Sequence, residues 1–106
     1  MVAETHIQEL VEVCGAAREV AEGFIYLPKL RLPRGCQPAE TDALLCLVTH
    51  NGYVTRLFLA QPVPNRRNDW TSFYIQGQNW YTWSWNDVSP QLRPAQVLAE
   101  HLRALR

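Results

Sequence analysis

Three cysteines and three histidines are the side chains of this chain best suited to covalent or metal chemistry. The cysteines are Cys14, Cys36 and Cys46. Their odd number and their spacing match neither a disulfide framework nor a zinc site. We therefore expect no bound metal and no cofactor, and we expect reduced thiols in a cytoplasmic protein.

Cys36 has the best case for reactivity, because it lies in a turn rich in proline and glycine. In an antiparallel sheet this turn lies at the same end as the loop that carries Arg66 and Arg67. Nearby cations favour a thiolate, although an ordinary turn cysteine is the competing interpretation. Cys14 and Cys46 lie in apolar segments, where a buried thiol behaves as a small hydrophobic side chain.

The histidines do not provide a base for Cys36. Cys36 and His50 are expected at opposite ends of the strand over 42–49, roughly 25 Å apart at about 3.3 Å per residue. A catalytic hydrogen bond spans only about 3 Å. His101 lies on the apolar stripe of the last expected helix, which indicates a packing role.

The acidic residues show no paired arrangement typical of a hydrolase, and no phosphate-binding glycine loop or nucleophile elbow occurs.

The charge of the chain is balanced overall but unevenly distributed. The formal net charge is zero, so no attraction to nucleic acid or to a membrane is expected. Residues 1–22 are mostly acidic and residues 29–67 are mostly basic. Base composition of the genome would explain the excess of arginine over lysine; a binding face of bidentate arginines is the functional interpretation. We place this partner-binding face at Arg34, Arg66 and Arg67.

These residues must be positioned by a single α+β domain that spans residues 1–106. The hydrophobic pattern predicts an antiparallel meander sheet of about four strands between an N-terminal and a C-terminal helix. The expected elements are a helix over 5–21 capped by Thr5, strands over 23–32, 42–49 and 53–60, one or two strands over 71–76 and 79–85, and a helix that begins at Pro94.

Three local signals refine this arrangement. Pro28 has no amide donor, which predicts that its strand is an edge strand or contains a bulge. Asn51 and Gly52 separate two apolar runs, which predicts a hairpin. The run 42–49 is almost continuously apolar, as is typical of a central strand covered on both sides. The pairing within residues 71–85 stays open, and an unpaired edge strand would permit a homodimer.

The tryptophans of residues 79–85 suggest a ligand surface as a further hypothesis. Alternation places Trp80 on one face of its strand and Trp83 and Trp85 on the other. One set is expected to pack against a helix. If the other set is exposed, it would stack against a glycan or another small ligand.

Short motifs along the chain resemble the prokaryotic ubiquitin-conjugating-enzyme-like families. They are Leu32-Pro33-Arg34-Gly35 after a strand, Gly52-Tyr53 between two strands, and Trp83-Ser84-Trp85 before the final helix. The order of elements is similar to the ubiquitin-conjugating and RWD superfamily over residues 20–105. Those families occur in bacterial operons beside ubiquitin-like and activating-enzyme genes. The resemblance therefore implies a ubiquitin-like protein or an activating enzyme from the same operon as the partner.

The catalytic residue of ubiquitin-conjugating enzymes has no counterpart in this chain. Their cysteine follows the meander and a His-Pro-Asn motif, whereas here Val63-Pro64-Asn65 lacks the histidine and no cysteine follows Cys46. The resemblance thus predicts a non-catalytic interaction module of a bacterial ubiquitin-like protein conjugation system. Whether the chain is an enzyme stays open, because an atypical nucleophile, Cys36 or Ser84, is the alternative.

Overall fold

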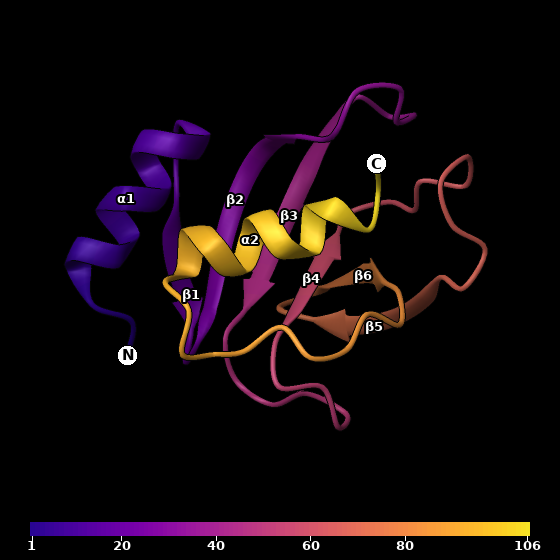
Figure 1. The fold of residues 1–106 in the computed structure, drawn as a ribbon. Coiled ribbons are helices and arrows are strands. Elements are labelled where there is room, and N and C mark those ends of the chain that lie inside the picture. The colour runs from indigo at the N-terminus through magenta and orange to yellow at the C-terminus, as the bar shows by residue number, and fades with distance from the viewer.

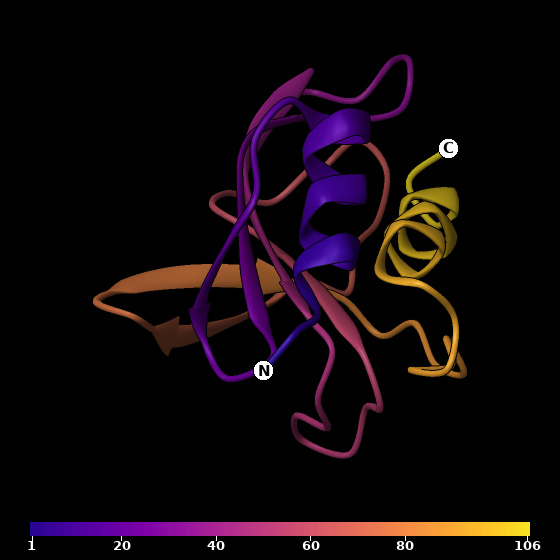
Figure 2. The same ribbon diagram turned by 90° about the vertical axis from the view of Figure 1, so that its left-hand side faces the viewer.

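The computed structural model describes all 106 residues and contains two helices and six strands (Figure 1). In chain order they are α1 (Glu4–Cys14), β1 (Arg18–Ala21), β2 (Phe24–Arg31), β3 (Glu40–Cys46), β4 (Arg56–Leu59), β5 (Thr71–Ile75), β6 (Gln78–Thr82) and α2 (Pro94–Arg103). Both helices lie on the same side of the sheet (Figure 2). The fold is therefore α+β, as predicted, with helices and sheet in separate layers.

The strands form one antiparallel sheet in the order β1-β2-β3-β4-β6-β5. The sheet has six strands and not about four, because β1 was not expected and residues 71–82 form a complete hairpin. β6 joins the sheet at Leu59 and Tyr81. The Thr82 hydroxyl strengthens this junction by donating a hydrogen bond to the Leu57 carbonyl, at 2.8 Å. β5 is left as the outer strand.

The prediction of one helix over 5–21 is wrong, because α1 ends at Cys14 and β1 follows. Gly15 adopts φ +94°, a conformation that glycine accepts without steric cost. Its amide donates to the Val11 carbonyl, which closes the helix. Thr5 does not cap α1 either, since the N-cap position is Ala3.

The bulge expected near Pro28 is present, but β2 is not an edge strand. The register between β2 and β3 shifts between Leu27 and Leu30, where Lys29 has φ +52°. The Lys29 amide donates to the Asp42 carboxylate at 2.9 Å. The extra residue reverses the alternation, so Leu30 joins the cluster under the helices whereas Tyr26 packs on the opposite face.

The sheet carries apolar clusters on both faces. The main core lies beneath the helices, and α2 crosses β2, β3 and β4 there (Figure 1). Its buried members include Leu10 of α1, Leu45 of β3 and Val97 of α2. A smaller cluster on the other face consists of Leu44, Cys46, Phe58 and Trp80 with partly buried neighbours. β3 is therefore covered on both sides, as its continuous apolar run predicted.

The turn at Asn51 and Gly52 and the start of α2 also follow the sequence signals. His50 and Tyr53 form an isolated antiparallel bridge, and the two residues between them have positive φ. α2 begins at Pro94, which suits the first helical position. Neither helix has the length and apolar character needed to cross a bilayer.

Candidate interaction site

The turn that carries Cys36 folds inward and places this residue in the core, which favours the interpretation of an ordinary turn cysteine over a reactive one. Gly35 has φ +88° and directs the following residue toward the core. Cys36 is 4% exposed and belongs to the main cluster. Its thiol donates to the Leu105 carbonyl at 3.3 Å. In this arrangement the sulfur is closed off from any acyl donor in solvent.

The other candidate nucleophiles are no better placed. Burial raises the pKa of the Cys46 thiol, which lies 3.1 Å from the Val48 carbonyl. Burial also raises the pKa of the half-buried Cys14 thiol. Ser84 is exposed, but its hydrogen bonds run through the backbone: the amide donates to Asp69 and the carbonyl accepts from Arg67. No hydrogen bond joins its hydroxyl to a histidine or a carboxylate.

Cys36 is expected to react with iodoacetamide at least about tenfold more slowly than Cys14 in the native protein, because a buried thiol is inert until the structure opens. Site-resolved mass spectrometry of the alkylated chain would measure both rates in one sample, with Cys14 as the internal reference. All three thiols should react at similar rates in denaturant. A native Cys36 that reacts as fast as Cys14 would show that the inward turn does not persist in solution.

The structure brings two of the three predicted partner-binding arginines together. The Arg66 guanidinium donates to the Arg34 carbonyl at 2.9 Å. Asn65 ties the same loops, since its side-chain amide donates to the Gly35 carbonyl and its oxygen accepts from the Gln37 amide. The loop 61–69 is therefore hydrogen-bonded to the turn after β2, as the antiparallel topology suggested.

Arg67 contacts other residues, namely Asp69 and Trp85. It makes two hydrogen bonds to the Asp69 carboxylate, at 2.9 and 3.0 Å, and its guanidinium lies 5.6 Å from the centre of a Trp85 ring. The ion pair raises the pKa of Arg67 and lowers the pKa of Asp69. Its charge is thus already compensated within the molecule.

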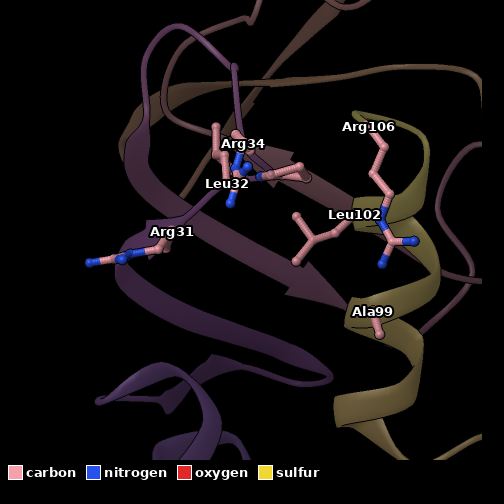
Figure 3. Close-up of a pocket in the computed structure, with 7 residues that line it drawn as sticks. Arg31, Leu32, Arg34, Ala99, Leu102 and Arg106 are labelled. Carbon is pink, nitrogen blue, oxygen red and sulfur yellow. The ribbon is translucent and has the colours of Figure 1, made fainter.

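A groove lies between the end of β2 and the last turns of α2. The hollow measures about 480 Å³, and apolar side chains of both segments, Leu32 and Leu102 among them, line it. Arg34 and Arg106 lie on either side of Leu102, and Arg31 extends outward nearby (Figure 3). The ion pairs of the molecule involve none of these three arginines. This groove combines an apolar lining with uncompensated positive charge.

Sequence reasoning found Arg34 but missed the other groove arginines. No motif marks Arg31 or Arg106 in the sequence. Leu102 is half-buried and Arg106 is exposed. The meeting of β2 with the end of α2 is a tertiary contact, so no local pattern could reveal it.

The tryptophans do not form an exposed platform. Trp80 and Trp83 are each 2% exposed, on opposite faces of the sheet. Trp70 and Trp85 are half-buried, and their indole N–H groups donate to the carbonyls of Arg67 and Glu100. The predicted alternation of Trp80 against Trp83 is confirmed, but the stacking surface that a glycan would need is not present.

A buried cation lies on the sheet face opposite the helices. Arg56 is 5% exposed, its Nε atom has no hydrogen-bond partner, and its guanidinium stacks 3.9 Å from the centre of the Tyr53 ring. The ring of His50 packs edge-on between Phe58 and Phe73, at 5.2 and 4.9 Å. The Arg56 guanidinium also lies 5.3 Å from the centre of the Phe73 ring and 5.9 Å from that of Phe58. Arg56 is therefore a cation held by aromatic rings, a structural role that the sequence did not indicate.

In comparisons with known proteins, no family model, no curated protein and no solved structure matches this chain. No three histidine, cysteine, aspartate or glutamate side chains gather in a way that could hold a metal ion. A function therefore has to follow from the geometry of the molecule together with its short motifs.

Proposed function

We propose that this chain is a non-catalytic interaction module that binds an acidic protein partner. The observation that carries the proposal is the concentration of uncompensated arginines at the end of the sheet where β2 meets α2. Arg31, Arg34 and Arg106 have no carboxylate partner, and the Arg66 loop packs against the same turn. Exposed arginine pairs well with carboxylates on a second molecule, because its planar guanidinium can form two parallel hydrogen bonds.

The partner that we propose is a ubiquitin-like protein or its activating enzyme from a bacterial conjugation system. The motifs around Arg34, Tyr53 and Ser84 support this proposal, together with a meander flanked by helices from the two ends of the chain. The ubiquitin-conjugating and RWD superfamily would be the corresponding fold family. A non-catalytic role fits better than an active enzyme, because the Cys36 thiol is buried and the Ser84 hydroxyl has no base.

Co-expression with the neighbouring ubiquitin-like and activating-enzyme genes tests the proposal. We expect co-purification without a shifted band on a gel, because the Cys36 thiol is buried and the exposed Ser84 hydroxyl has no base to activate it. A band that is lost with thiol reductant would indicate a cysteine thioester, and a band lost only in mild base would indicate a serine oxyester. Either band would overturn the non-catalytic role, and the absence of co-purification would overturn the partner.

Charge reversal of Arg34 is expected to weaken the association about five- to tenfold at low ionic strength, because it places a carboxylate where the acidic partner should bind. Arg18→Glu is the matched control, since Arg18 is exposed and stacks on Tyr26 on the other face of the sheet. Titration of the purified partner by calorimetry would compare both variants with the wild type. Equal affinities of Arg34→Glu and the wild type would exclude this surface.

A further inference from the structure

The arginine-rimmed groove continues along the junction of the two helices. A second hollow of about 320 Å³ shares Arg31 and Leu102 with the first and reaches Val13 at the end of α1. Val13 is an apolar residue of α1, and yet its side chain is 66% exposed. Leu102 thus separates two adjoining hollows, and apolar side chains of β2, α1 and α2 line them in turn.

The charges around this continuous groove are strongly one-sided. Its cations are Lys29, Arg31, Arg34 and Arg106, and its carboxylate is Glu40. None of the five side chains takes part in an ion pair within the molecule. Four positive charges against one negative charge favour a negatively charged occupant. The apolar lining between the cations favours an occupant that also carries an apolar side chain.

We infer that the groove docks a short acidic segment of a partner protein, with one apolar side chain over Leu102 and flanking carboxylates on Arg34 and Arg106. The inference rests on the proposed function and deepens it by naming the chemistry of the partner segment. A hollow of about 480 Å³ lies within the range of roughly 300–1,000 Å³ typical of ligand pockets. Carboxylates on both sides of the apolar anchor would then meet the two guanidinium groups that flank Leu102 (Figure 3).

A substitution at Ala99 tests the groove with little risk to the fold. Ala99 lines the groove from α2 and is exposed, and both glutamate and lysine are good helix formers. Ala99→Glu adds a negative charge inside the groove, and Ala99→Lys adds a side chain of similar length with the opposite charge. The probe is a fluorescein-labelled synthetic peptide of ten residues in which one leucine is flanked by glutamate and aspartate residues.

Fluorescence anisotropy should show at least about tenfold weaker binding of the peptide to Ala99→Glu and unchanged or tighter binding to Ala99→Lys. Replacing the leucine of the peptide with serine should also weaken binding at least about threefold. A peptide that binds Ala99→Glu as tightly as the wild type would overturn the groove as its site. A serine peptide that binds as tightly as the leucine peptide would overturn the apolar anchor.

The failure of this inference can be separated from the failure of the proposed function. If Arg34→Glu reduces co-purification of the ubiquitin-like partner but Ala99→Glu does not, the groove is not the docking site. The proposed function as an interaction module is then still supported. If the acidic peptide binds with the expected specificity and no neighbouring gene product co-purifies, the proposed partner falls and the groove chemistry stands. If the wild type is a dimer by sedimentation and Ala99→Glu is a monomer, the occupant is a second copy and the partner inference is overturned.

Discussion

Replacing Phe58 with alanine is expected to lower the free energy of unfolding by about 3–5 kcal/mol. Phe58 is fully buried on the sheet face opposite the helices. Its ring packs against Phe24, His50 and Phe73, with ring centres 6.5, 5.2 and 6.1 Å away. Truncation would leave a cavity at the centre of this cluster, and aromatic pairs contribute about 0.5–1.5 kcal/mol each beyond the area that they bury.

The loss should be largest in the part of the sheet that lacks helix cover. Phe73 belongs to β5, so the cluster is what holds the β5–β6 hairpin over the sheet, in addition to the short β4–β6 ladder. Amide hydrogen exchange should therefore accelerate more in β5 and β6 than in β3. Urea denaturation gives the total change in the free energy of unfolding.

Tyr74→Ala provides the matched control for this prediction. Tyr74 lies beside Phe73 on the same strand and is 74% exposed, so the substitution should change the free energy of unfolding by less than about 0.5 kcal/mol. Equal destabilisation by the two substitutions would mean that the second cluster does not form a core. A loss below about 1 kcal/mol for Phe58→Ala would lead to the same conclusion.

The parts of the fold that could be predicted are those with a strong local signal. The continuous apolar run near Leu45, the turn at Asn51 and Gly52, and the helix that begins at Pro94 each follow from neighbouring residues alone. β1 was missed because its apolar residues continue the helical period of α1. A glycine with φ +94° ends that helix, but a glycine in the sequence does not reveal which φ it will adopt.

The candidate site could be predicted in part. The approach of Arg34 and Arg66 followed from antiparallel topology, which places alternate connections at the same end of a sheet. The burial of Cys36 depends on the direction of a turn and on the end of α2, where Leu105 accepts its hydrogen bond. The contact of Arg31 with the groove depends on the bulge in β2 and on α2 together, so it required the tertiary structure.

Acidification from neutral pH is expected to destabilise the protein chiefly through His101. Its imidazole is 2% exposed, and burial, with a smaller contribution from the charge of Arg56, lowers its pKa from 6.5 to about 4. The Thr55 hydroxyl donates to the Val88 carbonyl at 2.8 Å, so its oxygen must accept from the His101 Nε2–H at 2.9 Å. Protonation would therefore occur at Nδ1 and would place a second positive charge in a region that already contains the buried Arg56.

The direction of the effect follows from the order of the two pKa values of His101. Because the folded pKa lies below the unfolded value, the unfolded chain binds the proton first and stability falls as the pH decreases. The stabilisation is complete above about pH 6.5 and is lost as the pH falls to about pH 4. The free energy of unfolding decreases by about 2 kcal/mol at pH 5 and by roughly 3 kcal/mol in total. His50 acts in the same direction, because burial and Arg56 lower its pKa as well.

His101→Gln separates this contribution from the others, because the glutamine amide can still donate to Thr55 but does not titrate. Urea denaturation between pH 7 and pH 5 should show a clearly smaller loss of stability for the variant than for the wild type. The carboxylates of Asp69 and Glu19 have lowered pKa values, so their protonation destabilises both proteins at still lower pH and does not affect the comparison. An equal slope for both proteins would mean that His101 takes up its proton in the folded state without penalty, and the imidazole would then have to reach water in solution.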